Sequence, residues 1–522
     1  MTVNIVGAGI SGLSASITLA EAGIESRLIS VQPSERAQSV LAEGGINGAL
    51  DTMGEDDNTQ NHFADTVRSG CGIADEAAVR GLTERAPEMI MWLSKIGVPF
   101  NMSGGKIQQR NFGGQKKKRT AYAMGSTGKA IMSALIDEAR KYEARGLITR
   151  FSSHEFTELI IKDNNCVGAA VRNTAAGETS VLGGPVVLAF GGMNGVFPDM
   201  TTGTTANSGE ALAKVFSQGV KLSNLEMIQY HPTTYGISGK RCLITEAARG
   251  EGGRLYIIRN NDNHSRYYFM EEKYPELKNL MPRDVVSREM YFVSHDEKNE
   301  PQVFLDMTVL SKETWNNKLP DLRKEIIHYM GKDPAKEPIP VEPGIHYFMG
   351  GIDVDAFHRT NINGLFAVGE CCSQYHGANR LGGNSLLGAC YSGRKVSEYI
   401  TAHKDEFKSE ADESFVSSEP FHSSPSVIYE IRDILLSGLG IVRDEGSICA
   451  ALGKLSKMRE NMSLSKGETA RLTLAEAMLL SAKVRRESRG AHFRSDYPER
   501  NDDYKKLTEA EWKGELNVTF KE

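Results

Sequence analysis

The sequence predicts an α/β protein with a Rossmann-like nucleotide-binding domain, an α+β capping domain inserted into it, and a C-terminal helical domain. Three observations lead to this prediction. A short apolar strand at residues 3–6 runs directly into the glycine-rich segment GAGISG. The strand-and-glycine pattern stops near residue 226 and resumes at residues 363–370. Beyond residue 426, apolar side chains recur at the spacing of amphipathic helices.

The N-terminal glycines predict a dinucleotide-binding loop. Gly7, Gly9 and Gly12 follow the apolar strand, and the small-residue helix LSASITLAEAG follows them. In this context the glycines form the turn, admit a pyrophosphate and bring the helix against the strand. The second strand ends at Ser30, where NAD-binding folds usually carry Asp or Glu. Ser30 therefore disfavours NAD and leaves room for FAD.

Composition divides the chain into segments. Residues 1–225 alternate strand and helix signals, whereas residues 226–340 are richer in Lys, Glu, Tyr and Pro and indicate an inserted domain. Residues 341–405 return to the first pattern and are expected to complete the nucleotide-binding domain. A polar linker at 410–425 precedes the predicted helical domain at 426–522.

The segment HGANRLGGNSLL at residues 376–387 predicts an anion-binding loop. His376 and Arg380 would form a cationic clamp, and the two glycines that follow would let the backbone approach a ligand closely. Asn384 and Ser385 are residue types that cap helices, and a helix N-terminus favours negative charge. An ordinary surface loop with a helix cap is the alternative interpretation.

Bulk properties narrow the class of protein. The 522 residues carry a net charge of −6 and a mean hydropathy of −0.35, which give no indication of nucleic-acid binding. No stretch reaches the roughly 18 apolar residues of a membrane span. The glycine motif lies so close to Met1 that no signal peptide fits before it. We therefore expect a cytoplasmic protein, with membrane association only through a partner.

Two further patterns are assigned to structure rather than to chemistry. The seven cysteines form no CxxC pair, so reduced structural thiols are expected, with no metal or iron–sulfur site. Electron transfer beyond a bound cofactor would then need a partner or a diffusible donor. The basic run at residues 116–119 is expected to form a solvated face.

Several separated motifs give the chain a resemblance to a known family. After the N-terminal glycines come QYHPT, LITEAARGEGG, PRDVVSR, GIHYFMGGI and RGAHFRSDYPER, in this order. The chain resembles the flavoprotein subunits of fumarate reductases and succinate dehydrogenases, a family that also contains L-aspartate oxidase. The resemblance covers nearly the whole chain and implies an FAD-dependent oxidoreductase that acts on a four-carbon dicarboxylate.

The resemblance implies a substrate site at the junction of the two domains. A dianion needs several charge-assisted donors, and Arg supplies a bidentate fork. The residues that match the family's substrate site are His231, Thr245, His346 and Arg380, together with Glu43, Gly45 and Phe112.

Catalysis in the family adds a hydride and a proton to opposite ends of a carbon–carbon double bond. Reduced flavin N5 supplies the hydride. Arg283 matches the family's proton donor, and Glu246 and Arg249 match the relay that connects this donor to solvent. Guanidinium rarely loses its proton, so a purely electrostatic role of Arg283 is the alternative.

The resemblance also implies how FAD is held. Family members often attach FAD covalently to a His, and Gln38 stands at that position, so FAD is expected to be non-covalent. The absence of a covalent bond and the presence of Glu43 both favour fumarate reduction over succinate oxidation. The residues expected to bind FAD are Gly7, Ala8, Gly9, Ile10, Ser11, Gly12, Ser30, Gln38, Ser39, Gly44, Gly45, Glu210, Glu370, Ser385 and Leu386.

L-Aspartate oxidase is the main rival assignment. Its substrate site carries a Glu where this chain has Phe112, and usually Ala-Ser where this chain has Gly382 and Gly383. Both differences disfavour an amino-acid substrate, although LITEAARGEGG looks oxidase-like. A succinate dehydrogenase subunit is a further candidate, and so is a flavin carrier whose role is docking to an iron–sulfur subunit. Reduction of fumarate or a close enoate is the favoured hypothesis.

Overall fold

The computed structural model describes residues 1–260, 263–407, 421 and 423–521. Its centre is a five-stranded parallel sheet in the order β21-β12-β1-β2-β8. The edge strand β21 comes from beyond the inserted segment, so the second chain segment completes the sheet. The strands are β1 (Thr2–Val6), β2 (Glu25–Ser30), β8 (Ile148–Ser152), β12 (Val186–Leu188) and β21 (Leu365–Ala367).

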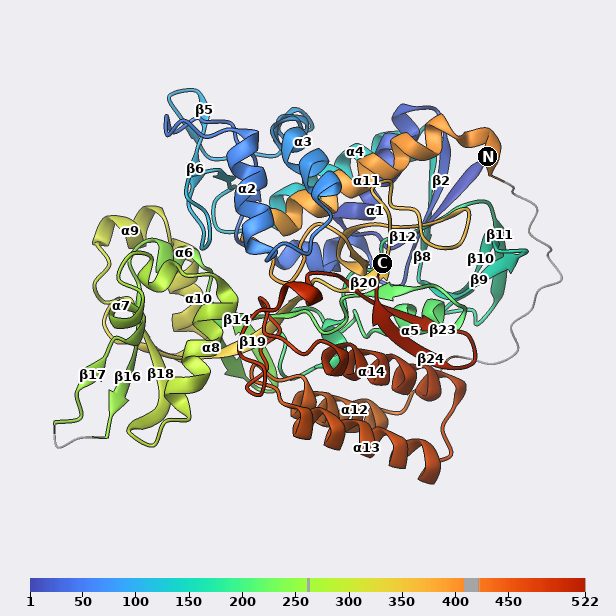
Figure 1. The fold of residues 1–522 in the computed structure, drawn as a ribbon. Coiled ribbons are helices and arrows are strands. Elements are labelled where there is room, and N and C mark those ends of the chain that lie inside the picture. The colour runs from blue at the N-terminus through green and yellow to red at the C-terminus, as the bar shows by residue number, and fades with distance from the viewer. Residues whose placement is uncertain (261–262, 408–420, 422, 522) are drawn as a thin grey trace.

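This sheet lies between two layers (Figure 1). Its side chains alternate between them, because neighbouring residues of a strand point to opposite faces. Ile5 and Leu28 pack with the helices, while Val6 and Ile29 pack with the small sheet β11-β10-β9. The packed elements are helices α1 (Ile10–Glu21), α3 (Glu76–Lys95), α4 (Thr127–Glu143) and α11 (Asn384–Ala402), and strands β9 (His154–Lys162), β10 (Asn165–Asn173) and β11 (Thr179–Gly183).

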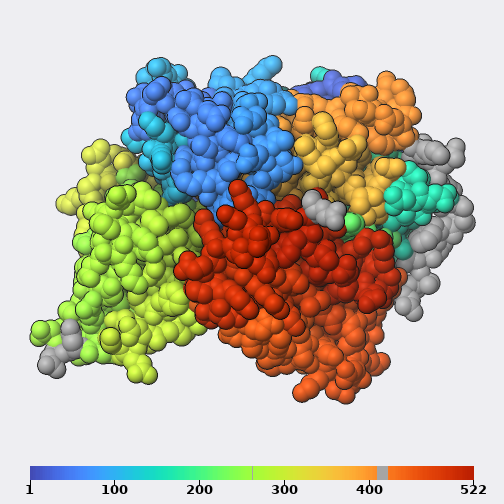
Figure 2. All heavy atoms as spheres, viewed as in Figure 1, coloured from blue at the N-terminus to red at the C-terminus, as the bar shows by residue number. Residues whose placement is uncertain are grey.

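The inserted segment forms a six-stranded antiparallel sheet with its own apolar core. It lies at one end of the molecule (yellow-green in Figures 1 and 2). The sheet order is β15 (Lys240–Leu243), β14 (Ile228–Ile237), β19 (Ile339–Phe348), β18 (Asn299–Asp306), β16 (Arg254–Arg259) and β17 (Arg266–Tyr267). The helices are α6 (Ala247–Gly250), α7 (Phe269–Lys273), α8 (Arg283–Ser294), α9 (Lys312–Asn317) and α10 (Pro320–Met330).

The C-terminal segment is helical only in its first part, which differs from the helical domain expected for its whole length. Helices α12 (Pro425–Gly438), α13 (Glu445–Asn461) and α14 (Lys466–Val484) are followed by the hairpin β23 (Thr508–Trp512) and β24 (Leu516–Phe520). Because β23 buries Thr508 and Ala510 beside β13, its strand form depends on a distant partner. The sheet order is β22 (Cys372–Ser373), β20 (Gly351–Asp353), β13 (Leu222–Ser223), β23 and β24.

Several shorter elements complete the described part of the fold. Most of the predicted polar linker falls on residues 408–420 and 422, outside the described residues. In the part of the chain that is described, no helix has the length and apolar character needed to cross a membrane. The remaining α-helices and strands are β3 (Ile46–Asn47), α2 (Thr59–Ser69), β4 (Met102–Ser103), β5 (Lys106–Ile107), β6 (Gln109–Arg110), β7 (Thr120–Ala121) and α5 (Glu210–Ser217).

Candidate active site

A cavity of about 650 Å³ lies between the parallel sheet and the capping segment. This volume is typical of sites for cofactors and other small molecules. Gly12 and Arg249 lie outside its wall, although both were expected to belong to the site. The expected residues that line it are Gly7, Ala8, Gly9, Ile10, Ser11, Ser30, Gln38, Ser39, Glu43, Gly44, Gly45, Phe112, Glu210, His231, Thr245, Glu246, Arg283, His346, Glu370, Arg380, Ser385 and Leu386.

The N-terminal glycines leave no room for side chains where strand and helix meet. Gly7 has a φ of +121°, and a Cβ there would overlap the carbonyl oxygen of Ala189. A Cβ on Gly12 would overlap the carbonyl oxygen of Gly7, which explains why Gly12 serves packing rather than the cavity wall. Gly9 is the N-cap of α1 and offers no side-chain oxygen to the first turn. The Ile10 N–H of that turn donates to the Ser39 hydroxyl at 3.3 Å, and the helix N-terminus suits a phosphate.

The second glycine loop brings the N-terminus of α11 to the cavity. Its N-cap is Gly383, with a φ of +84°, rather than Asn384 or Ser385 as the sequence suggested. A Cβ on Gly383 would overlap the side chain of Asn47, so this close approach requires glycine. Ser385 lines the cavity from the first turn of the helix. A helix end of this kind stabilises negative charge on a bound group.

Arg380 belongs to the cavity wall, whereas its expected partner His376 does not. The Arg380 guanidinium lies 4.3 Å from the ring centroid of Tyr347, and the His376 ring meets the Tyr347 ring edge-on, with 5.4 Å between the centroids. The buried Nε of Arg380 has no hydrogen-bond partner among the described residues. Burial and the nearby Arg283 charge lower the pKa of Arg380 to about 9. An anion would supply the missing partner and relieve this repulsion.

Two histidines from neighbouring strands of the capping sheet face each other at the cavity. The rings of His231 on β14 and His346 on β19 lie 5.1 Å apart. The His346 ring also hydrogen-bonds through Nδ1 to the Thr202 hydroxyl, at 2.8 Å. Burial and the charge of Arg283 hold the pKa of both rings well below the ordinary histidine value. Both are therefore neutral near pH 7 and can donate hydrogen bonds, while the arginines provide the positive charge.

Arg283, Glu246 and Arg249 form a buried chain that reaches the cavity. Nε and Nη2 of Arg283 donate to Glu246 Oε2 at 3.0 and 2.6 Å. Arg249 Nη2 lies 3.5 Å from Glu246 Oε1, and its Nη1 donates to the Asn279 carbonyl. Burial opposes ionisation of Glu246, but the charges of Arg283 and Arg249 outweigh it and lower the pKa. Gln229, which was not among the expected site residues, accepts a hydrogen bond from Arg283 Nη1.

Glu43 and Phe112 form another part of the wall. Gly44 follows Glu43 in the chain, and a Cβ on Gly44 would lie 3.0 Å from the Phe112 ring. Burial and the carboxyl of Glu325 raise the pKa of Glu43 to about 8, although the Arg110 charge opposes this. Glu43 therefore carries a proton at neutral pH, and this part of the wall presents an aromatic ring and a neutral acid.

Two acidic residues occupy the nucleotide-binding side. Glu210, the first residue of α5, pairs with Lys214 at 2.7 Å and with Arg471 of α14 at 3.0 Å. Glu370 accepts a hydrogen bond from the Phe348 N–H, and burial raises the pKa of its carboxyl to about 7. Glu210 thus has fixed partners on both carboxylate oxygens, one of them from the C-terminal segment.

Comparison with known proteins identifies the family. The FAD binding domain profile matches residues 2–386, and the profile of the fumarate reductase flavoprotein C-terminal domain matches residues 467–522. The chain belongs to the flavoprotein family of succinate dehydrogenases, fumarate reductases and L-aspartate oxidases. It is therefore an FAD-dependent oxidoreductase, and the predicted family, cofactor and fold class are confirmed.

Relatives from different branches of this flavoprotein family are about equally similar to the chain. The succinate dehydrogenase flavoprotein subunit of Bacillus subtilis is 35% identical over 96% of this chain and 92% of its own length. L-Aspartate oxidase 2 of Ralstonia nicotianae is 34% identical over 95% of this chain and 91% of its own length. The FrdA chain of E. coli quinol fumarate reductase has a TM-score of 0.88 at 29% identity. The match covers 100% of this chain and 96% of the FrdA chain. Overall similarity therefore leaves the substrate and the direction open.

The cavity fits the FAD of this family. Two helix N-termini without side-chain caps, at Gly9 and Gly383, line one continuous cavity, which suits an elongated, negatively charged cofactor. Gln38 also lines it and accepts a hydrogen bond from the Thr204 N–H. Gln229 lies within the motif QYHPT but could not be selected from the sequence, because its role depends on a contact with α8.

The basic run at 116–119 is not a solvated face as a whole. The Arg119 side chain is fully buried between two carboxylates, whereas Lys118 is exposed and pairs with Glu55. The expectation of solvation was therefore wrong for Arg119, because acidic residues 54 to 62 positions earlier in the chain provide its partners.

All seven cysteines are free thiols, and no cluster of metal-binding side chains occurs among the described residues.

Proposed function

We propose that this chain reduces fumarate, or a close enoate dicarboxylate, to succinate. The observation that carries the proposal is that the Arg283–Glu246 pair borders the same cavity as Arg380, whose Nε has no hydrogen-bond partner in the described part of the chain. A cationic group that can bind a carboxylate and a guanidinium that can deliver a proton thus border one space. Reduction of an activated double bond needs both.

The substrate dianion is bound by charge and by neutral donors. Arg380 binds one carboxylate, and its missing hydrogen-bond partner provides the driving force. The neutral rings of His231 and His346, with the Thr245 hydroxyl, donate to the remaining oxygens. Withdrawal of electron density through the bound carboxylate makes the β-carbon of the enoate electrophilic.

Arg283 supplies the proton to the other carbon of the double bond. FAD in its reduced form, when bound, supplies the hydride from N5. Glu246 holds the Arg283 guanidinium in a fixed orientation, and the route through Glu246 and Arg249 returns a proton to Arg283 after each turnover. Hydride and proton add across one double bond, so fumarate becomes succinate, and an electron donor must reduce the FAD again before the next turnover.

L-Aspartate oxidation is the second candidate, because the Ralstonia relative carries that name. An amino-acid substrate would bring an ammonium group that needs a carboxylate partner. Phe112 is apolar, and the neighbouring Glu43 is protonated near pH 7 because burial raises its pKa to about 8. These two residues support the enoate over the amino acid.

The direction and the electron source are part of the proposal. Gln38 cannot form the covalent flavin bond that the family associates with succinate oxidation, so FAD is non-covalent and reduction is the favoured direction. Electrons reach FAD from an iron–sulfur partner subunit or from a soluble donor. The proposed location is the cytoplasm, with any membrane contact made through a partner.

The test is reoxidation of the reduced flavoprotein without oxygen. The purified holoprotein is reduced with dithionite, fumarate is added, and flavin absorbance and succinate are followed. Rapid return of the oxidised spectrum with succinate formation supports the proposal. Absence of reoxidation by fumarate, together with flavin reduction when L-aspartate meets the oxidised protein, assigns the chain to L-aspartate oxidase instead.

The variant Arg283→Gln tests the residue that carries the proposal. Loss of a proton donor lowers kcat by about 10²–10⁴-fold, while FAD binding is retained. Arg288→Gln on the same helix is the matched control, because Arg288 stacks on Phe493 outside the cavity. Full activity of Arg283→Gln contradicts the assignment of the proton donor. A loss in Arg288→Gln of the same size means that damage to α8 explains the result.

A further inference from the structure

Arg119 is buried in a clamp formed by the carboxylates of Asp57 and Asp65. Its Nε and Nη2 donate to the two carboxylate oxygens of Asp57 at 3.0 and 2.9 Å, and its Nη1 lies 2.9 Å from Asp65 Oδ2. The exposed fractions of the three side chains are 0%, 1% and 4%. Such a planar, bidentate pair fixes orientation as well as position.

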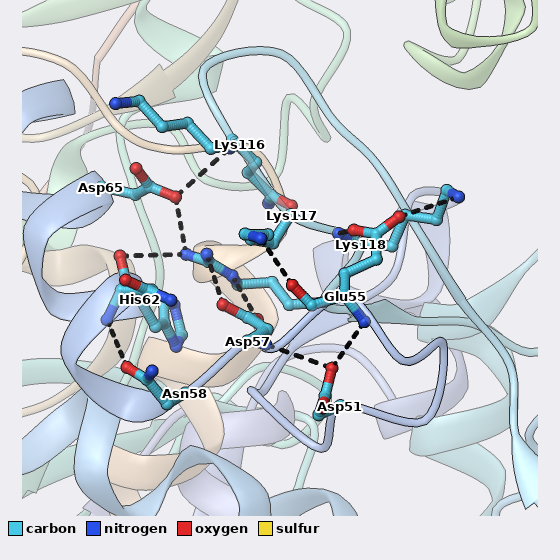
Figure 3. Close-up of polar contacts among 12 residues, drawn as sticks. Asp51, Glu55, Asp57, Asn58, His62, Asp65, Lys116, Lys117 and Lys118 are labelled. Carbon is cyan, nitrogen blue, oxygen red and sulfur yellow. Dashed lines mark hydrogen bonds and ion pairs between the residues drawn. The ribbon is translucent and has the colours of Figure 1, made fainter.

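The acidic side of the clamp is itself ordered by a turn. Asp51 Oδ1 accepts hydrogen bonds from the backbone N–H of Glu55 at 2.9 Å and of Asp57 at 3.1 Å. Glu55 then meets Lys118, with an ion pair at 2.9 Å. Figure 3 shows Glu55 and Asp57 close to Asp51 and facing the lysine run. The segment at 51–57 and helix α2, which carries Asp65, therefore both face the residues 116–119.

Residues 113–119 form one segment, with Arg119 at one end and Gly113, which contacts the Glu246 carboxylate, at the other. The Gly113 N–H donates to Glu246 Oε1 at 3.1 Å, and Glu246 Oε2 holds Arg283. A Cβ on Gly113 would overlap Glu246 Oε1, so the backbone lies directly against this oxygen. Only five residues separate Gly113 from Arg119. The backbone path from the clamp to the contact with Glu246 is therefore short.

A second connection runs from the same segment to the glycine loop before α11. Gln115 Nε2 donates to the Gly382 carbonyl at 2.7 Å and to Asn47 Oδ1 at 2.9 Å. Asn47 donates to Asn384 at 2.7 Å, and the His62 ring of α2 bonds the same Asn384 oxygen through Nε2. Each bond in this set is buried, so the positions of its members depend on one another.

We propose that Arg119, held by Asp57 and Asp65, is a positioning residue that places the Gly113 N–H against Glu246 and so orients Arg283 for proton delivery. This inference rests on the proposed function, because it assigns Arg119 a role in the same proton-transfer chain. Arg119 touches neither the cavity nor the substrate site directly. Its effect therefore appears in turnover and not in FAD binding.

The experiment compares Arg119→Lys with the control Lys116→Gln in the FAD-loaded protein. Lys keeps the charge but cannot form the bidentate bonds. We expect Arg119→Lys to lower kcat for fumarate by about tenfold or more, with KM and FAD content within about twofold of the wild type. Lys116→Gln changes an exposed side chain of the same basic run and keeps the backbone N–H that reaches Asp65, so it should leave both parameters unchanged.

The double variant Arg119→Lys/Gly113→Ala tests the route. If Arg119 acts through Gly113 and Glu246, the double variant is no slower than the slower single variant, because both changes disturb one contact. Multiplicative effects on kcat, or a kcat of Arg119→Lys within about twofold of the wild type, overturn the proposal. Loss of activity that FAD supplementation fully restores also overturns it.

A second variant keeps the proposal testable if Arg119→Lys does not fold. Asp65→Asn retains the bidentate Arg119–Asp57 pair and removes one charge only. The same loss in kcat at constant KM is expected, to a smaller extent, and unchanged kcat overturns the proposal. If the wild type turns over L-aspartate instead of fumarate, the proposed function fails, and the same variants are compared with L-aspartate.

Discussion

One carboxylate oxygen of Glu246 accepts two hydrogen bonds from the Arg283 guanidinium, at 2.6 and 3.0 Å. Both residues stand at helix N-termini of the capping segment, at α6 and α8. The second oxygen of Glu246 receives the Gly113 N–H from the nucleotide-binding part. The carboxylate that holds the proposed proton donor therefore also makes a contact between the capping segment and the nucleotide-binding part.

Removal of the Glu246 charge is expected to slow turnover strongly. In Glu246→Gln the buried Arg283 loses its ionised partner and its fixed orientation, and we expect kcat to fall by about 10²-fold or more. FAD content should not change. Stopped-flow reoxidation of the reduced flavin by fumarate measures the rate.

Glu251→Gln is the control for this variant, because Glu251 pairs with Lys318 a few residues further along the chain from Glu246. A wild-type rate in Glu246→Gln would mean that the carboxylate has no part in orienting or reprotonating Arg283.

Arg380→Lys is expected to weaken substrate binding. Lysine keeps a positive charge but loses the planar fork and the contact with the Tyr347 ring, which lies 4.3 Å from the guanidinium. We predict a KM for fumarate at least about tenfold higher, measured in steady-state assays with a reduced dye as donor. Arg394→Lys, on the helix that follows and stacked on Trp92, should leave KM unchanged. Equal KM values for wild type and Arg380→Lys would remove Arg380 from the substrate site.

The flavin is expected to leave the protein on denaturation. Gln38 lines the cavity where many family members carry the linking His, and an amide cannot form that bond. Acid precipitation of the holoprotein should therefore release all FAD into the supernatant, where its absorbance and chromatographic mobility identify it. Flavin that stays with the washed protein pellet would show a covalent link at another residue.

The stability of the FAD-free protein is expected to depend on Glu43. Burial raises the pKa of this carboxyl from 4.5 to about 8, so between these values the folded state keeps a proton that the unfolded chain has lost. Stability from this group therefore falls as the pH rises through that window. Glu43→Gln removes the dependence and should gain about 5 kcal/mol relative to the wild type at the upper end of the window, because each pKa unit corresponds to about 1.4 kcal/mol.

Urea unfolding at several pH values, followed by circular dichroism, tests this sign. The difference in unfolding free energy between Glu43→Gln and the wild type should grow from acid to alkaline pH. A constant difference across the window would mean that Glu43 titrates at its ordinary pKa in the folded protein.

Local patterns in the sequence were sufficient for much of the nucleotide-binding part. The strand before Gly7, the helix after it and the strand that ends at Ser30 all form as predicted, as β1, α1 and β2. Glycine spacing and apolar runs are properties of neighbouring residues, so they can be recognised without the fold. The motifs around His231, Arg283 and His346 likewise selected residues that meet in one cavity.

Contacts between distant segments could not be predicted in this way. Local pattern gave no sign of the hairpin at the C-terminus, because β23 is stabilised by pairing with β13, which lies almost 290 residues earlier. The N-cap of α11 is Gly383 rather than Asn384, because the Asn384 side chain is bonded to His62 and Asn47 instead.

The sequence by itself determined the family, the FAD cofactor and the set of residues that were candidates for the site. Only the tertiary structure decided which of these residues line the same cavity and that His376 does not. It also decided that Arg119 is a buried member of an ion cluster. The reason is physical. Propensity and motif describe a residue and its near neighbours, whereas burial, charge pairing and pKa depend on groups that chain folding brings together.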